Sequence, residues 1–375
     1  MKLRKSMNSS NDNIFDKRQT NIAKGVALLL LFWHHLFFDA PENYHLFTSV
    51  WNNTVPIECF FARFCRVCVA MFLFLSGFGL YKSWQKDCEI IIRFGDNNLT
   101  IRHYLVFLKN HILKLMFNYW FVFLIFVPMG ILFGREFWII YEGNIFYGIF
   151  DFCGLADMFS TPTMNATWWF MSTIILLYVL FPLFAKVLEW SPETFVVLSI
   201  ILMVFPYFSS IVFIGQYFVW FPPFVVGMYF AHQDSFDKIR QNNEALPKQI
   251  VFSVLLILLS AFISLVTGNS VSFDTLFAFS IILFSYFVLS KIPIVCGVLE
   301  QLGKHSGAIF MFHTFIFLYY FKELIYWFKY SLIIFIVMTV VCYIISVGLE
   351  KLKKLLGYDK LVEKLKSSEQ LRSKC

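Results

Sequence analysis

The sequence predicts an all-α, polytopic membrane protein with about ten transmembrane helices and both termini in the cytoplasm. Hydrophobic residues make up 59% of the 375 residues and charged residues only 15%, and the mean hydropathy is +0.68. Soluble domains average about 45–50% apolar and about 25% charged residues, so a water-soluble fold of this length could not cover so much apolar surface. The two further observations are a series of long uncharged runs and the placement of basic residues between them.

A transmembrane helix needs about 20 mainly apolar residues, and ten runs in the chain meet this requirement. They lie near residues 22–38, 65–81, 115–133, 168–187, 194–213, 217–231, 249–267, 271–290, 306–321 and 330–349. A further run, 137–155, is interrupted by acidic residues, and we expect it to be an interfacial or re-entrant segment on the outer side. Ten spans place both termini on the same side of the membrane, whereas counting 137–155 as an eleventh would separate them.

Lysine and arginine set the expected orientation. They cluster in the N-terminal segment, in the stretch after the second run and in the C-terminal tail, whereas the loop after the first run has Arg63 as its only Lys or Arg. The positive-inside rule therefore places both termini in the cytoplasm and that loop outside. Because this topology accounts for the net charge of +7, we expect no nucleic-acid partner.

We expect three regions: a cytoplasmic N-terminal segment over 1–20, a ten-helix membrane domain over 21–350 and a basic cytoplasmic tail over 351–375. No small-residue cleavage site follows the first apolar run, so we expect the N-terminus to be retained. Leucines at helical spacing in the tail alternate with lysines, which predicts an amphipathic helix on the cytoplasmic leaflet in contact with membrane lipid. A solvated extension of the last span is the alternative.

The eight cysteines are scattered, and only Cys65 and Cys68 form a CxxC pair. No second pair and no nearby pair of histidines completes a zinc set, so we expect a packing role and no metal site. Arg63 and Arg66 flank the outer end of the second span, where they would either bind an acidic acceptor or cap the helix.

Ionisable residues inside spans are costly and are therefore functional candidates. The first span holds Lys24, His34 and His35, and the ninth holds His313. Eleven residues are about three helical turns, so Lys24 and His35 share one face about 16 Å apart along the axis, while His34 is turned roughly 100° away. A neutral histidine suits general-base chemistry near pH 7. The alternatives are that Lys24 extends to the headgroups and that His35 is a hydrogen-bonded packing residue.

Several short motifs occur in a fixed order. Residues 24–35 read as a basic residue, ten spacer residues and a histidine. The others are MFLFLSGF at 71–78, FLKNHILK at 107–114, WFM at 169–171 with Tyr178 and Phe181-Pro182 following, FVVG at 224–227, and LGKHS at 302–306 before His313. In this order the chain resembles the membrane-bound acyltransferase 3 family. It departs from the family pattern at Lys24, where Arg is more frequent, and at His111 and Lys114, where the family has RxxR.

The resemblance implies an enzyme that moves an acyl group, often acetyl, from cytoplasmic acyl-CoA to a hydroxyl of a surface polysaccharide or lipid-linked glycan. Expected partners are acyl-CoA, with acetyl-CoA as the main candidate, a glycan or glycolipid acceptor and polysaccharide-assembly proteins. We expect no bound cofactor, and a location in the plasma membrane, with a residue composition that suits an AT-rich bacterial genome.

The resemblance and the shared helical face both point to His35 as the catalytic residue. Lys24, His111 and Lys114 would hold the phosphates of acyl-CoA on the cytoplasmic side, because fixed positive charge suits phosphate. Cavity-lining positions are expected at His34, His313 and Trp169, although His313 would equally suit a hydrogen bond between packed helices, and Trp169 an anchor at the outer interface.

Three other functions remain open. A transporter or flippase of envelope precursors would also use a lysine and histidines within spans, but the paired broken helices of inverted repeats are not found. A different class of membrane acyltransferase, using a histidine and an asparagine, is the second alternative. A non-catalytic membrane subunit of a polysaccharide-assembly machine is the third, and it would not need His35.

Overall fold

The structure is a computed structural model that describes residues 15–38, 41–49, 55–93, 101–204, 217–241, 246–268 and 270–370. Within these ranges the regular elements are all helices, which confirms the all-α fold class. One isolated β-bridge pairs Thr48 with Tyr330. The first half contains α1 (Lys17–Leu36), α2 (Ile57–Cys65), α3 (Cys68–Arg93), α4 (Ile101–Met129), α5 (Phe137–Ile140), α6 (Ile145–Phe152), α7 (Trp169–Trp190) and α8 (Pro192–Val204). The second half contains α10 (Phe221–His232), α11 (Ser235–Gln241), α12 (Leu246–Val266), α13 (Asp274–Phe287), α14 (Pro293–Thr314), α15 (Lys322–Tyr326), α16 (Ser331–Leu355) and α17 (Tyr358–Gln370).

Six helical segments of the described chain are long and apolar enough to cross a membrane. They are Ile57–Cys88, Arg102–Phe133, Ala166–Trp190, Leu246–Val266, Val271–Lys291 and Ser331–Leu355. Each coincides with one of the ten expected spans, which supports a polytopic membrane protein.

The other four expected spans, and the orientation of the termini, stay predictions. The run 22–38 lies in α1, and 217–231 is mostly α10, a helix of 12 residues. The run 306–321 joins the end of α14 to a π-helical segment, η8 (Phe315–Tyr320). Part of 194–213 lies outside the described residues, as do the basic residues of 1–14 and of 371–375.

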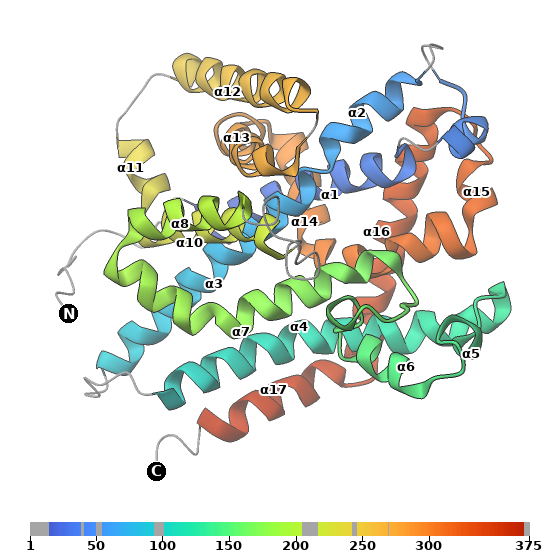
Figure 1. Ribbon diagram of the computed structural model, residues 1–375, viewed down its shortest axis with the longest axis horizontal. Coiled ribbons are helices and arrows are strands. Elements are labelled where there is room, and N and C mark those ends of the chain that lie inside the picture. Colours follow the sequence, from blue (N-terminus) through green and yellow to red (C-terminus); the bar gives the residue numbers. More distant parts are fainter. Residues whose placement is uncertain are drawn as a thin grey trace.

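The segment 137–155 forms two short helices, α5 and α6, neither of which is long enough to span a bilayer. Figure 1 shows them beyond the C-terminal end of α4, grouped in one corner of the molecule. This arrangement agrees with the expected interfacial or re-entrant segment, although no membrane position is tested.

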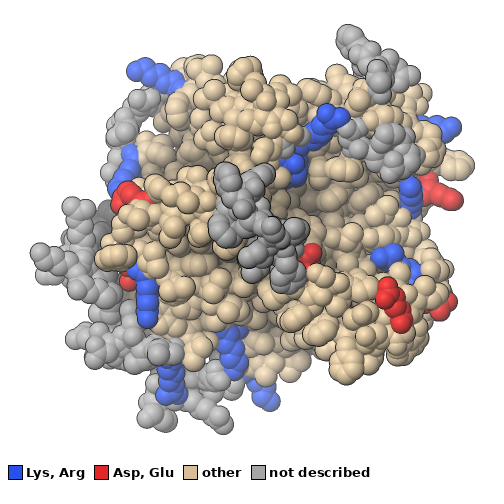
Figure 2. Space-filling model, viewed as in Figure 1, with Lys and Arg blue, Asp and Glu red and all other residues tan. Residues whose placement is uncertain are grey.

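The surface of the helical bundle is largely uncharged. Most of the face in Figure 2 carries neither acidic nor basic side chains. Large apolar side chains stay exposed along α12 and α16, among them Leu255, Phe262 and Ile344. An exposed apolar surface of this kind suits lipid, because the bilayer core is itself hydrocarbon.

Two helix crossings depend on reciprocal glycines. A Cβ on Gly77 of α3 would overlap the carbonyl oxygen of Phe224, and a Cβ on Gly227 of α10 would overlap that of Phe74. Gly25 of α1 and Gly303 of α14 form the same arrangement against Leu299 and Asn21. Helices pack this closely only where small residues let the backbones approach, so each pair fixes where its two helices cross.

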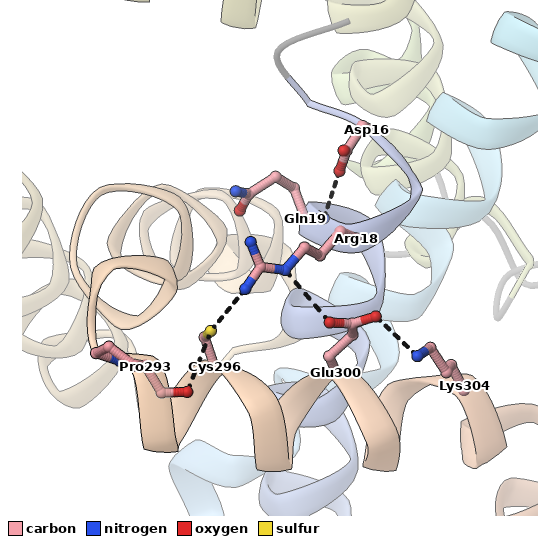
Figure 3. A network of polar contacts seen from close by, with 7 residues as sticks. All are labelled: Asp16, Arg18, Gln19, Pro293, Cys296, Glu300 and Lys304. Carbon is pink, nitrogen blue, oxygen red and sulfur yellow. Dashed lines mark hydrogen bonds and ion pairs between the residues drawn. The ribbon is translucent and has the colours of Figure 1, made fainter. Parts of the chain in front are cut away.

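The polar contacts at the start of α1 hold that helix against α14. Figure 3 shows the Arg18 guanidinium between Cys296 Sγ, at 3.1 Å, and the Glu300 carboxylate, at 3.3 Å. Lys304 contacts the other oxygen of Glu300 at 2.8 Å. Together with the Gly25–Gly303 crossing, this network fixes the register between the two helices that carry the candidate site.

The tail forms a separate helix. A turn at Gly357, whose φ is +64°, separates α16 from α17, so the last span does not continue straight into the tail. Tyr358 Oη donates to the Phe117 carbonyl at 2.9 Å, and Lys353 Nζ donates to Asn118 Oδ1 at 2.6 Å. Figure 1 shows α17 running alongside α4. The predicted contact of this helix with lipid is not tested.

Candidate active site

One helix, α1, carries the predicted base and the predicted donor-binding lysine. Asp16 caps its N-terminus by accepting a hydrogen bond from the Gln19 backbone N–H at 2.9 Å. The helix runs without a break through Lys24 and His35, so the two side chains share a face about 16 Å apart along the axis. Both side chains are half-buried.

The His35 ring lies against a second histidine from a distant part of the sequence. The ring centroids of His35 and His313 are 5.1 Å apart, and those of His35 and Phe317 are 6.0 Å apart. No hydrogen bond joins the His35 ring to any described residue. The imidazole therefore makes ring contacts, and its nitrogens have no hydrogen-bond partner among the described residues.

The His313 ring is fully buried and is held at both nitrogens. Nδ1 lies 2.8 Å from the Phe310 carbonyl and 3.2 Å from the Ile309 carbonyl. Since a carbonyl can only accept, Nδ1 carries a proton, which leaves Nε2 as the acceptor of the neutral ring. Nε2 lies 3.4 Å from Thr314 Oγ1.

A chain of buried polar groups continues from His313. Thr314 Oγ1 lies 3.1 Å from Thr167 Oγ1, and Thr167 Oγ1 lies 2.8 Å from Asn165 Oδ1. None of these side chains is more than 6% exposed. The π-helical segment η8 begins one residue after Thr314, and π-helical turns are frequent at functional sites.

The loop before α7 is fixed to α14 through the same residues. Asn165 Nδ2 and Trp168 Nε1 both donate to the Met311 carbonyl, at 3.2 and 2.8 Å. The Ala166 backbone N–H donates to Tyr319 Oη at 3.2 Å. The loop is thus positioned by the helix that carries His313.

The predicted donor-binding residues lie on α1 and α4. Lys24 lies on α1 and Lys114 on α4, near enough for their positive charges to repel each other. His111 lies one turn before Lys114 on α4, and its Nε2 is 3.2 Å from Ser83 Oγ. Two amines near each other suit an anionic ligand, and acyl-CoA as that ligand stays a prediction.

The other predicted lining residues differ in how they relate to His35. The His34 ring lies against the His35 ring, with centroids 5.0 Å apart. His34 Nδ1 contacts the Ala62 carbonyl at 2.8 Å, which ties α1 to α2. Trp169 stacks near Trp220, with centroids 5.7 Å apart, and its neighbour Trp168 is the one that reaches α14. No direct contact joins Trp169 to His35 among the described residues.

Arg66 has a structural partner. Its Nε donates to Asp274 Oδ2 at 3.1 Å and its Nη2 to Oδ1 at 3.4 Å, and Asp274 is buried. The charge of Arg66 is thus neutralised inside the bundle, which favours neither an acceptor site nor a simple helix cap. The structure leaves Cys65 and Cys68 as free, buried thiols.

A buried carboxylate organises the segment around α6. Asp151 Oδ2 accepts from Tyr141 Oη at 2.7 Å and from the Met164 N–H at 2.8 Å, and Oδ1 accepts from Thr163 Oγ1 at 2.9 Å. Burial raises the pKa of Asp151 to about 6, although these hydrogen bonds oppose the rise. Asp151 thus fixes the loop residues that come directly before Asn165.

Sequence reasoning missed the Asn165, Thr167 and Thr314 chain. Its members are uncharged and belong to two distant segments, so neither charge nor spacing singles them out. The one signal in the sequence is that Thr314 directly follows His313.

A family model described as an acyltransferase domain, that of the acyltransferase 3 family, matches residues 19–348. This range includes α1 from its third residue onward, the LSGF and FVVG segments and both candidate histidines. No curated protein and no solved structure shows a significant match to the chain.

Proposed function

The chain belongs to the acyltransferase 3 family, and from this premise we propose that it is an O-acyltransferase of the plasma membrane that acts on surface glycans. The donor is cytoplasmic acyl-CoA, with acetyl as the expected acyl group. The acceptor is a hydroxyl of a surface polysaccharide or a lipid-linked glycan, in the envelope of a bacterium. Membership of the family supports the acyltransferase class, and the donor and acceptor are part of the proposal.

The observation that carries the proposal is the His35 ring. It sits on the same face of α1 as Lys24, and its nitrogens have no hydrogen-bond partner among the described residues. A general base must reach the proton that it abstracts, and the unpartnered nitrogens of His35 can meet an acceptor hydroxyl directly. Both nitrogens of His313 already lie against other groups of the protein, so His35 is the histidine that meets the acceptor.

The reaction follows from these positions. Lys24 and Lys114 attract the phosphates of acyl-CoA, and the pantetheine arm extends along the Lys24–His35 face. His35 takes the proton of the acceptor hydroxyl while the oxygen of that hydroxyl bonds to the acyl carbon. The C–S bond breaks, and the CoA thiolate leaves and regains a proton. A variant route carries the acyl group briefly on His35 before the hydroxyl attacks.

Acyl transfer in membranes that contain this chain tests the proposal. Membranes are supplied with labelled acetyl-CoA and a panel of envelope glycans, and the wild type is compared with His35→Ala. We expect label in extractable glycan with the wild type alone. If equally folded His35→Ala protein transfers as much label as the wild type, His35 is not catalytic. If neither transfers label, longer acyl donors are tested before the transporter alternative is taken up.

A further inference from the structure

The buried hydrogen-bond chain from His313 to Asn165 lacks one donor when the His313 ring is neutral. We propose that Asn165, Thr167 and Thr314 are positioning residues that stabilise a proton on His313 during acyl transfer, an inference that rests on the proposed function. The number of protons along the chain and the direction of each hydrogen bond support this role.

Asn165 fixes the far end of the chain. Its Nδ2 donates to the Met311 carbonyl at 3.2 Å, so its Oδ1 is the atom that faces Thr167. Oδ1 can only accept, and it receives the Thr167 backbone N–H at 3.0 Å and the Thr167 hydroxyl at 2.8 Å. The short hydroxyl contact is made when Thr167 donates its single proton to Asn165.

The direction of the remaining contacts then follows. Once Thr167 has donated to Asn165, its oxygen can only accept from Thr314, 3.1 Å away. Thr314 has then used its own proton, so it can only accept from His313 Nε2, 3.4 Å away. The whole chain is therefore satisfied when Nε2 carries a proton. Because Nδ1 already donates to the Phe310 carbonyl, that state of His313 is the imidazolium.

A neutral His313 leaves the chain one hydrogen bond short. Thr314 can donate to Nε2 and Thr167 to Thr314, but the Asn165 oxygen then keeps only the backbone N–H of Thr167. The two hydroxyls can reverse direction by rotating, without any movement of the backbone. The chain thus makes its last hydrogen bond only when positive charge arrives, and an interaction of that kind lowers the barrier to reaction rather than improving substrate binding.

The source of the proton is the acceptor hydroxyl. It passes first to His35 and then to His313 Nε2, as the Thr314 hydroxyl turns from Nε2 towards Thr167. The centroids of the two histidine rings are 5.1 Å apart. His313 holds the proton while the new C–O bond forms and the C–S bond breaks. The proton returns to the CoA thiolate at the end of the cycle. Acceptor hydroxyl and acyl-CoA thus give the ester and free CoA, with no other reactant.

Removing single hydroxyls tests this role. Thr314→Val and Thr167→Val keep the shape of the side chain and remove the hydroxyl. We expect each to lower kcat about 10- to 100-fold with little change in the KM for acyl-CoA, because the lost bond forms only in the transition state. Thr314→Ser and Thr167→Ser should restore most of the activity. Thr173→Val is the matched control, since this buried hydroxyl contacts only the Trp169 carbonyl of its own helix, at 3.5 Å.

A second measurement does not depend on activity. ¹⁵N NMR of histidine-labelled protein should show the resting His313 ring as the Nδ1–H tautomer, with an Nε2 resonance that shifts in Thr314→Val. Wild-type kcat in both valine variants, or an Nε2 resonance that is unchanged in Thr314→Val, would overturn the proposal. If the wild type transfers no acyl group, the proposed function fails. The NMR result then decides by itself whether the Thr314–Thr167–Asn165 hydrogen bonds act on the His313 ring.

Discussion

The imidazole rings of His35 and His313 lie with their centroids 5.1 Å apart and their planes inclined by 47°, although α1 and α14 are at opposite ends of the chain. The Gly25–Gly303 crossing and the Arg18 network fix the register of these helices. The two rings therefore meet because the backbones are held close together, and the proposed catalytic arrangement depends on this packing.

The two histidines should differ in their importance. We expect His35→Ala to lower acyl transfer by at least about 10³-fold, within the range of general acid–base catalysis, and His313→Ala by a smaller factor of about 10²-fold. In the proposed mechanism His313 holds the proton after His35 has taken it, so part of the rate should survive without His313. Kinetics in membranes with labelled acyl-CoA would measure both factors. Equal rates for His313→Ala and the wild type would contradict its assigned part.

Lys24 should act on the donor. Lys24→Gln removes one of two neighbouring positive charges, and we expect the KM for acyl-CoA to rise about tenfold, which corresponds to about 1.4 kcal/mol of binding free energy. Lys24→Arg keeps the charge and should stay near the wild type. Calorimetric titration of the purified protein with CoA would measure the binding directly. An acceptor KM that changes more than the donor KM would count against this role.

The glycine crossings give a prediction with an internal control. Gly77→Ala places a methyl group on the Phe224 carbonyl, and backbone at that position cannot move without separating α3 from α10. We expect a loss of more than about 3 kcal/mol of stability, the upper end for an overpacked core, or a failure to fold. Gly79→Ala on the same helix meets open space and should change stability by less than about 0.5 kcal/mol.

Gly303 and Gly307 repeat this comparison on α14, where only Gly303 lies against a backbone, that of Asn21. Thermal unfolding in detergent would rank all four variants. Equal midpoints for Gly77→Ala and Gly79→Ala would show that the close approach is not required for stability.

The sequence predicted those features of the fold that depend on hydrophobicity. The six described helices that are long and apolar enough to span a membrane all fall on predicted runs, because a bilayer imposes a length and an apolar character that a single segment displays. The short length of α10 and the π-helical segment after His313 depend on packing between distant helices, so no local sequence pattern predicts them. The site divides in the same way. The Lys24–His35 face follows from helical spacing, whereas the contact with His313 and the Asn165–Thr314 chain needs the tertiary structure.

The Arg66–Asp274 pair should behave as a buried ion pair. Arg66→Met leaves the Asp274 carboxylate buried without its partner, and removing one member of such a pair costs about 3–5 kcal/mol. The double variant Arg66→Met/Asp274→Leu replaces both charges with apolar groups, and we expect most of that stability to return. The unfolding midpoints of Arg66→Met, Asp274→Leu and the double variant, compared with the wild type, form a thermodynamic cycle. Strictly additive losses would show that the two residues are not coupled.

Asp151 should make the stability of the protein depend on pH. Burial raises its pKa from 3.8 to about 6, so the folded protein binds this proton more tightly than the unfolded chain does. The associated stability is complete below about pH 3.8 and is lost as the pH rises through about 6, and the shift corresponds to an order of 3 kcal/mol. Asp151→Asn cannot ionise, yet its amide oxygen can still accept from Tyr141 and the Met164 N–H.

The difference in unfolding midpoint between Asp151→Asn and the wild type should therefore grow in favour of the variant between pH 5 and pH 7. Asp151→Ala serves as the contrasting variant, because it leaves the Tyr141 hydroxyl and the Met164 N–H without their acceptor. Each buried group left unpaired costs about 1–3 kcal/mol, so the alanine variant should be the least stable at every pH. A wild type whose stability relative to Asp151→Asn stays constant over this range would show that the carboxylate titrates outside it.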